Sequence, residues 1–264
     1  MYLNPQYRQD LFKGTSAYYS QYRTPYIKNM IEELIKSAGI TPDDTLLDIA
    51  CGPGRLTLPM SGYFRKVFAI DWEKEMIEEG ERVSKNLKIE NIKWIIGKAE
   101  EQNFEPGTFK LITIGDAFHR LDQLRILENS YKMLASGGCI ALIWSSTVTN
   151  GEEAWQKELK RITSPWAKPN SPAANTINNV QFGETTLKEF GFRDVSSKTF
   201  EEKLMLNIKE ITGYLYSMSV YSKNVIGDGY LEFESAIKDC LLQINPDNKF
   251  ECVFGCGYYL GRKG

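Results

Sequence analysis

The stretch LLDIACGPGRLTLP at residues 46–59 decides the fold. In this stretch an apolar run with an acid near its end is followed directly by a turn that contains glycines. Leu46 and Leu47 belong to a run that is apolar on both faces, as a strand buried in a parallel sheet must be. Gly52 and Gly54 allow the backbone to turn sharply and allow another group to approach it closely. The question is whether that group is a phosphate.

The composition is that of a globular protein without a strong charge bias. The chain has 264 residues, which is enough for one large α/β domain or one such domain with an insertion. The net charge of −2, from 34 acids and 32 bases, and the lack of a long basic run argue against a nucleic-acid partner. No apolar run reaches membrane-spanning length, and the polar, aromatic N-terminus is unlike a signal peptide.

The five cysteines lack the spacing of a disulfide framework, which predicts reduced thiols and a cytoplasmic location. Cys252 and Cys256 resemble a metal-binding pair. However, the chain has one histidine, His119, and no second cysteine pair follows. We therefore expect no metal site.

Apolar runs of strand length alternate with helical patterns through the first half of the chain. Helices are predicted at residues 24–38, 76–87 and 121–134, the first capped by Thr24 with Pro25 at its first position. The alternation predicts a parallel sheet with helices on both faces. The five clear strands are TLLDIA, KVFAID, KWIIG, FKLITIG and GCIALIWS.

The second half is less regular. A helix is predicted at residues 151–162, and a Pro-, Asn- and Ser-rich loop at 164–179. Two weaker strands are expected at residues 193–206 and 249–263, and helices at 208–216 and 231–242. These elements should complete the sheet and add a cover over it.

The glycine turn does not fit the common phosphate-binding motifs. A dinucleotide site needs G-x-G-x-x-G, but counting from Gly52 the third glycine is replaced by Thr57. The pattern G-x-x-x-x-G-K-[ST] is also absent, which excludes a P-loop. Asp71, the acid after the second strand, suits a dinucleotide or another nucleoside ligand.

The stretch at residues 46–59 resembles motif I of class I S-adenosylmethionine-dependent methyltransferases, whose pattern is acid-x-Gly-x-Gly-x-Gly. Asp48, Gly52 and Gly54 match this pattern, and Ala50 replaces the first glycine. Four further segments resemble the later motifs in the right order: VFAIDWEKEMI, GKAEEQNF, FKLITIGDAFHRLD and YKMLASGGCIALIW. The opening LFKGTSAYYSQYRTPY is similar to a subgroup that includes trans-aconitate methyltransferase-like and other small-molecule enzymes.

The resemblance implies a Rossmann-like α/β fold with a seven-stranded, mostly parallel sheet, its last strand antiparallel, and a small C-terminal cap. It implies one methyltransferase domain over residues 1–264, with its core at about 24–146 and 180–264. Residues 1–23 would cover the cofactor, and residues 147–179 and 207–245 would be cap or substrate-facing insertions.

The resemblance also implies a site for S-adenosylmethionine. Asp48 would meet the ammonium group, and Asp71 would accept both ribose hydroxyls. Trp72 and Met76 would pack on adenine, while Ala99 offers its amide. Glu100 or Glu101 would accept from the exocyclic amine; Tyr19 or Arg23 would meet the carboxylate. The full cofactor set is Asp48, Ala50, Gly52, Gly54, Asp71, Trp72, Met76, Ala99, Glu100, Asp116, Tyr19 and Arg23.

These assignments have structural alternatives. Asp48 and Asp71 can also cap helices, and Met76 can be an ordinary core residue. Asp116 can contact the substrate instead of the cofactor. The aromatic residues of the opening segment can pack on the sheet, and Trp144, Trp166, Tyr214, Tyr216 and Tyr221 can line an acceptor pocket or belong to the core.

His119 is the candidate catalytic residue because it follows the fourth strand, near the expected methyl group. An imidazole there can act as a general base at neutral pH, in which case the rate would fall as pH drops through the histidine range. The alternative is that His119 only binds the substrate. In the resembling subgroup the next residue is often tryptophan, whereas here it is Arg120.

The leading hypothesis is methyl transfer by in-line displacement to a small-molecule acceptor, at O, N or C. The alternatives are a tRNA-modifying methyltransferase, a non-catalytic S-adenosylmethionine-binding protein and, last, a nicotinamide-dependent oxidoreductase. The expected protein is a monomer or homodimer with no membrane partner.

Overall fold

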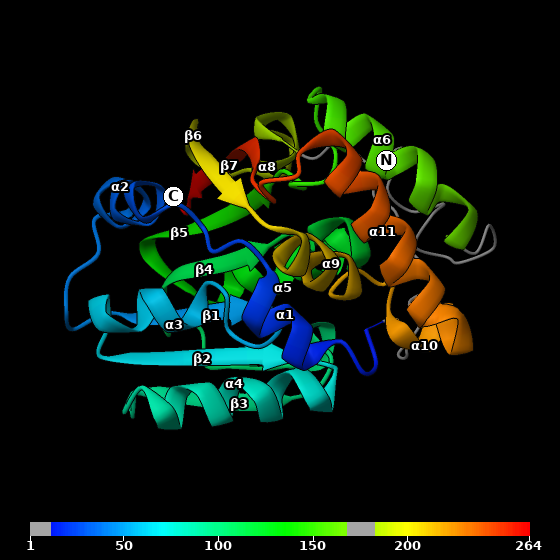
Figure 1. Ribbon diagram of the computed structural model, residues 1–264. Helices are drawn as coiled ribbons and strands as arrows, with labels where there is room; N and C mark the ends of the chain where they lie inside the picture. Colours follow the sequence, from blue (N-terminus) through cyan, green and yellow to red (C-terminus); the bar gives the residue numbers. More distant parts are fainter. Residues whose placement is uncertain (1–11, 168–182) are drawn as a thin grey trace.

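The computed structural model describes residues 12–167 and 183–264, which build a seven-stranded sheet with helices on both faces (Figure 1). The strand order is β3-β2-β1-β4-β5-β7-β6. Neighbouring strands from β3 to β5 pair in parallel, and β7 is antiparallel to both β5 and β6. The predicted fold is therefore confirmed. The strands are β1 Thr45–Ile49, β2 Lys66–Asp71, β3 Ile92–Ile96, β4 Phe109–Gly115, β5 Leu134–Ser145, β6 Arg193–Leu206 and β7 Phe250–Arg262.

The helices lie mostly where the apolar periodicity predicts them. The α-helices are α1 Ser16–Tyr22, α2 Lys28–Ala38, α3 Thr57–Met60, α4 Lys74–Asn86, α5 Gln123–Met133, α6 Ala154–Thr163, α8 Glu184–Phe190, α9 Ile208–Tyr216, α10 Lys223–Ile226 and α11 Tyr230–Ile244. Short 3-10 turns include η2 Ala99–Glu101 and η3 Phe118–Arg120. Local caps explain several starts: the Asp122 side chain accepts from the Arg125 amide at α5, and Asn207 and Glu210 form a capping box at α9.

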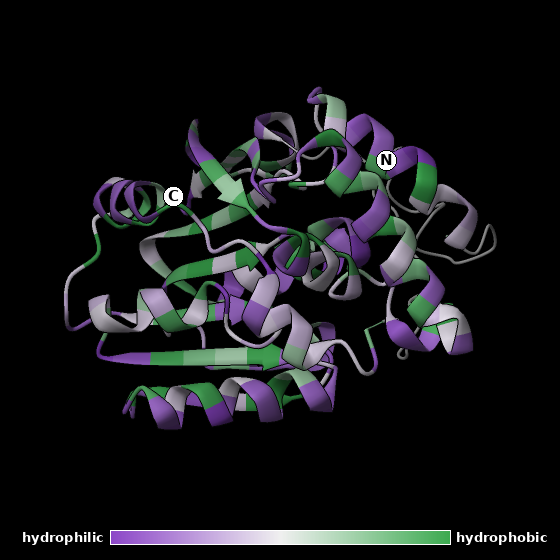
Figure 2. Ribbon diagram, viewed as in Figure 1, coloured by the Kyte–Doolittle hydropathy of each residue, from purple (hydrophilic) through white to green (hydrophobic). Residues whose placement is uncertain are grey.

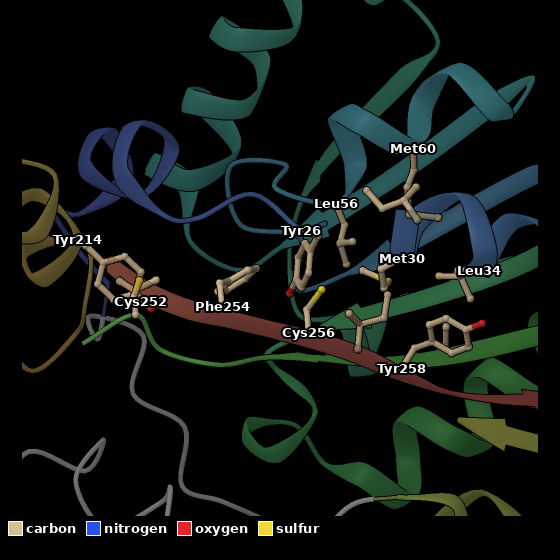
Figure 3. Packing of buried hydrophobic residues seen from close by; sticks show 14 of the residues in the cluster. Tyr26, Met30, Leu34, Leu56, Met60, Tyr214, Cys252, Phe254, Cys256 and Tyr258 are labelled. Atoms are coloured by element: carbon tan, nitrogen blue, oxygen red, sulfur yellow. The ribbon is translucent and has the colours of Figure 1, made fainter. Parts of the chain in front are cut away.

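Alternation along the strands divides the core between the two faces of the sheet. On β1, Leu46 packs in the cluster that contains α2 and β7, whereas Leu47 packs in the cluster that contains α5 and α8. Figure 3 shows part of the first cluster, in which Tyr26 and Met30 face Cys256 and Phe254 of β7. Figure 2 shows hydrophobic colouring along the central strands. Burial on both faces explains their continuous apolar runs.

The first predicted helix begins later than expected. Thr24 and Pro25 do not start it; α2 begins at Lys28, after Ile27. The Thr24 carbonyl accepts from Arg55 Nε at 2.6 Å, and the Tyr26 hydroxyl donates to Asp116 at 2.8 Å. These long-range bonds hold residues 24–27 outside the helix. The helix predicted at 121–134 ends at Met133, and Gly137 and Gly138 lie within β5, which begins at Leu134.

Two tight turns lie at the carboxyl edge of the sheet. Ala50 after β1 and Asp116 after β4 both have a φ of 53°, a left-handed conformation that is costly for a residue with a side chain. The late helices α9 to α11 lie toward this edge, and α1 lies beside α9 (Figure 1). The predicted boundaries at 1–23 and 147–179 fall partly outside the described residues, as does most of the predicted loop at 164–179.

Two further observations concern the described residues alone. Within 12–167 and 183–264, no helix is both long enough and apolar enough to cross a membrane. The same residues contain no group of three or more His, Cys, Asp or Glu that could hold a metal ion. Cys252 and Cys256 are free thiols buried in β7.

Candidate active site

Three cavities lie in a row at the carboxyl edge of the sheet. The first, of about 310 Å³, lies at the ends of β1, β2 and β3, and its lining includes Asp71, Trp72, Ala99 and Glu100. The second, of about 70 Å³, shares Ala50 and Asp71 with the first. The third, of about 340 Å³, shares Tyr19 and Asp116 with the second. The shared side chains make the row one continuous candidate site.

Asp71 stands between the first and second cavities. One carboxylate oxygen accepts from the Gly52 amide at 2.8 Å, and the other accepts from the Glu73 amide at 2.9 Å. Burial raises the pKa of Asp71, while these backbone bonds oppose the rise. Each carboxylate oxygen can accept more than one hydrogen bond, so the oriented group retains capacity for a ligand hydroxyl.

The far wall of the first cavity comes from the turn after β3. Trp72 lies under the Lys98 ammonium, which is 5.1 Å from the ring centroid. The Glu100 carboxylate accepts from the Asp122 amide at 3.2 Å, whereas Glu101 pairs with Lys98 at 3.2 Å. Both glutamates line the cavity, so the choice between them for an exocyclic amine stays open.

The second cavity lies against the glycine turn. Gly52 and Gly54 have φ angles of 55° and 92°, and a Cβ at Gly52 would lie 3.9 Å from the Tyr19 ring. Met76 is buried in the lining, and its predicted role as a cofactor contact stays a prediction. Tyr19 covers the cavity from α1, which Ser20 ties to Glu79 of α4. The turn and α1 therefore enclose a narrow passage.

Asp48 lies beneath this turn and is not among the residues that line the three cavities. Its carboxylate accepts from the hydroxyl of Thr57 at 2.5 Å and from that of Thr113 at 2.8 Å. Burial raises its pKa to about 6. The structure thus shows Asp48 joining β1 to α3 and β4. Its predicted contact with an ammonium group remains a prediction.

An ion pair that the sequence patterns did not reveal lies beside the third cavity, which Asp116 lines. Asp116 accepts from Arg55 at 2.8 Å, from the Tyr26 hydroxyl at 2.8 Å and from the Ser145 amide at 2.7 Å. The Arg55 side chain is 10% exposed and also bonds the Thr24 carbonyl. Arg55 lies in the turn after a buried strand, where an arginine requires a carboxylate partner. Its place in the sequence was the signal that could have indicated this ion pair.

The remaining predicted site residues, Arg23 and His119, line the third cavity. Arg23 donates to the Tyr214 hydroxyl at 3.0 Å, and its Nε is a buried donor without a hydrogen-bond partner among the described residues. His119 accepts at Nε2 from Arg120 Nε at 3.1 Å. Burial, reinforced by the Arg120 charge, lowers the pKa of His119 to about 4. Among the described residues, the lining consists of Phe12, Tyr19, Arg23, Asp116, His119, Arg120, Ser145, Thr147, Met218, Ser219 and Val220.

Four of the five aromatic residues considered for an acceptor pocket have other roles in the structure. Trp166 packs edge-on against Phe233, with ring centroids 5.5 Å apart, and Tyr221 stacks on the same ring. Tyr216 donates to Glu234 at 2.9 Å, and Tyr214 contacts Arg23. These four residues build the cap and are not part of the third cavity's lining.

The charges and shape of the row fit S-adenosylmethionine. The first cavity pairs an aromatic side chain with the oriented Asp71 carboxylate, as a nucleoside requires. Asp71, Glu73 and Asp116 line the second cavity, and carboxylates favour a sulfonium and an ammonium over a phosphate. The row continues beyond this point into a cavity large enough for a second small molecule.

Comparisons with known proteins agree with this chemistry. Residues 46–138 match the family model described as a methyltransferase domain. A Dictyostelium discoideum protein named as a methyltransferase is 26% identical over 242 residues, covering 89% of this chain and 86% of that protein. A demethylmenaquinone methyltransferase of Geobacillus sp. is 27% identical over 194 residues, covering 71% of this chain and 81% of its own.

Solved structures show the same fold. One from Anaeromyxobacter dehalogenans, named as a type II methyltransferase, has a TM-score of 0.63 at 16% identity, covering 91% of this chain and 98% of that one. Haemonchus contortus phosphoethanolamine N-methyltransferase 2 in complex with S-adenosyl-L-methionine has a TM-score of 0.55 at 15% identity, covering 98% of this chain and 58% of that one. The matched domain and these relatives support a class I S-adenosylmethionine-dependent methyltransferase.

Proposed function

We propose that this enzyme transfers the methyl group of S-adenosylmethionine to a small-molecule acceptor, at an oxygen, nitrogen or carbon atom. The observation that carries the proposal is the row of three cavities joined by Asp71 at one end and Tyr19 and Asp116 at the other. Two ligands in adjoining cavities are what an in-line transfer requires.

In this proposal the first two cavities hold the cofactor. Asp71 accepts from the ribose hydroxyls, because the Gly52 and Glu73 amides already orient its carboxylate. Trp72 and Ala99 flank the adenine, and Glu100 or Glu101 accepts from its amine. The bound cofactor supplies an electrophilic methyl group with a good leaving group.

The third cavity holds the acceptor. Its volume of about 340 Å³ suits a small molecule, and hydroxyl, imidazole and guanidinium groups line it. The Arg55–Asp116 pair joins the turns that follow β1 and β4, and Asp116 lines this cavity. The curated relatives named for demethylmenaquinone also support a small molecule over a macromolecule.

The protein's contribution to the reaction is alignment and exclusion of water. Tyr19 from α1 and Arg120 from η3 both line the second and third cavities, so the two segments enclose the point where the ligands meet. Enclosure keeps water from the methyl group, and fixed walls keep the acceptor in line with it.

The direct test is formation of S-adenosylhomocysteine by the purified protein. The assay supplies S-adenosylmethionine with pools of small carboxylic acids, phenols, quinols and amines, and in parallel with unmodified tRNA. We expect turnover with at least one small-molecule pool and its loss in Asp71→Ala. Turnover with tRNA alone would replace the proposal by tRNA modification. Tight cofactor binding without turnover on any pool would favour a non-catalytic binding protein.

A further inference from the structure

The two residues of η3 that face the third cavity form a pair of their own. Arg120 Nε lies 3.1 Å from His119 Nε2, and guanidinium nitrogens donate but do not accept hydrogen bonds. His119 Nε2 is therefore the acceptor in this contact, and its lone pair is occupied. A neutral imidazole carries one proton, so that proton must reside on Nδ1.

This geometry removes the lone pair that a general base would use. Burial and, to a smaller extent, the Arg120 charge also lower the pKa of His119 to about 4, so the ring is neutral at physiological pH. A group with so low a pKa holds a captured proton poorly. The ring can instead donate a hydrogen bond through Nδ1.

The other described residues of the third cavity do not supply a base either. Asp116 is the carboxylate among them, and it already accepts from Arg55, Tyr26 and Ser145. The remaining polar side chains of the lining are hydroxyls and the guanidinium groups of Arg23 and Arg120. Guanidinium groups are permanently charged donors and cannot remove a proton.

We propose that His119, held by Arg120, is a hydrogen-bond donor that positions the acceptor, and that the acceptor's attacking atom enters already deprotonated. Suitable acceptors are carboxylates, phenolates and enolates. The proposal rests on the methyl transfer proposed above and narrows its substrate class. It also assigns His119 to substrate positioning, one of the two roles that its place in the sequence left open.

The electron balance requires no base. The attacking atom's lone pair forms the new bond to the methyl carbon, and the electron pair of the sulfur–methyl bond remains on sulfur. The acceptor's negative charge and the sulfonium's positive charge disappear together, and no proton is released. A carboxylate or enolate accepts from His119 through its oxygen, and the positive charges of Arg23 and Arg120 favour an anion in this cavity.

The first experiment measures the tautomer and the pKa of the His119 imidazole by NMR, and it does not require enzymatic activity. The chain contains one histidine, so every histidine signal in a ¹⁵N-labelled sample belongs to His119. We expect the neutral Nδ1–H tautomer throughout the neutral range, with protonation beginning only near a pKa of about 4. An Nε2–H tautomer, or titration at the ordinary value of 6.5, would overturn the proposal.

Several charged or titratable groups surround the His119 ring. A matched pair of variants therefore tests whether Arg120 is the group that sets its pKa and tautomer. Arg120 and Asp116 flank it in sequence, and Arg23 and Tyr19 share its cavity across from η3. Arg120→Gln should raise the pKa of His119 and release the tautomer. Arg161→Gln, which removes an exposed arginine of α6, should change neither. Identical histidine spectra for Arg120→Gln and Arg161→Gln would contradict the hydrogen bond between Arg120 and His119.

The second experiment uses whichever acceptor the assay identifies. His119→Gln retains an N–H donor, whereas His119→Phe retains only bulk. We expect KM for the acceptor to rise about tenfold in the Phe variant, the scale of one lost hydrogen bond, with a much smaller change in the Gln variant. For a carboxylate acceptor, which is fully ionised in this range, the pH profile of kcat should be flat from about pH 6 to 9.

These outcomes separate the inference from the proposed function. Methylation of a neutral alcohol or amine, with a kcat that falls as His119 becomes protonated, would leave the proposed function intact and refute the inference. Absence of turnover on every small molecule would refute the proposed function, while the tautomer measured by NMR would still stand.

Discussion

At the residue scale, the site depends on carboxylates whose hydrogen-bond partners differ. Asp71 is oriented by two backbone amides and lines two cavities. Asp48 is turned inward to two threonine hydroxyls. Asp116 accepts hydrogen bonds from an arginine, a tyrosine and a serine. Each environment predicts a different response to mutation.

Asp71→Asn should weaken binding of S-adenosylhomocysteine by about 1.5–3 kcal/mol, the scale of a hydrogen bond to a charged group. Asparagine keeps the size of the side chain but offers one acceptor oxygen and no charge. Isothermal titration calorimetry measures the change, with exposed Asp43→Asn as the control. An affinity equal to that of the unmodified protein would remove Asp71 from the ribose site.

Asp48 should make stability depend on pH in a recognisable direction. Its folded pKa of about 6 lies above the ordinary value of 3.8, so the folded state binds the proton more tightly. Its contribution to stability is therefore present below about pH 4 and is lost as pH rises through 6. The loss amounts to about 3 kcal/mol, since a pKa difference of one is worth about 1.4 kcal/mol.

Urea unfolding of the unmodified protein and of Asp48→Asn across this pH range isolates the effect. His119 acts in the opposite direction, because its folded pKa of about 4 lies below 6.5, but both proteins contain it and its contribution cancels. The difference in unfolding free energy between the two proteins should change with pH. A constant difference would show that Asp48 is not the titrating group.

At the element scale, α1 forms one wall of the site and packs against α9. Tyr22 of α1 packs directly on Gly213 of α9, where an added Cβ would lie 2.4 Å from a ring carbon. Arg23 at the end of α1 donates to Tyr214 and to the Ser217 carbonyl. Since Tyr19 lines two cavities, the position of α1 sets their shape.

Gly213→Ala should therefore displace α1 and affect both stability and ligand binding. Overpacking of this kind costs about 1–3 kcal/mol. We expect a lower unfolding midpoint and weaker binding of S-adenosylhomocysteine. Gly62→Ala is the control, because a Cβ at Gly62 meets no atom within 4 Å. Binding that is unchanged in Gly213→Ala would show that α1 is not part of the cofactor site.

Elements set by local patterns could be predicted from the sequence, whereas those set by distant contacts could not. The predicted helix at 208–216 matches α9 because its capping box and apolar face lie within the segment. The late start of α2 depends on two long-range bonds, from Arg55 to the Thr24 carbonyl and from the Tyr26 hydroxyl to Asp116, and no local pattern contains these contacts. The Arg55–Asp116 pair itself joins residues separated by 61 positions.

At the scale of the whole molecule, the topology explains why separate sequence motifs form one site. Strands β1, β2 and β4 are neighbours in the sheet and run parallel, so Ala50, Asp71 and Asp116 all emerge at its carboxyl edge. This convergence was predictable from the motif order. The third cavity was not, because it needs Met218 and Ser219 from the C-terminal part to meet η3.

The central claim is that the row of cavities holds the cofactor and the acceptor end to end. A crystal structure with S-adenosylhomocysteine tests it most directly. We predict the ribose hydroxyls on Asp71, the adenine beside Trp72 and Ala99, and the sulfur directed toward the cavity that contains Arg23 and His119. A nucleoside bound elsewhere, or a sulfur directed away from that cavity, would contradict the account.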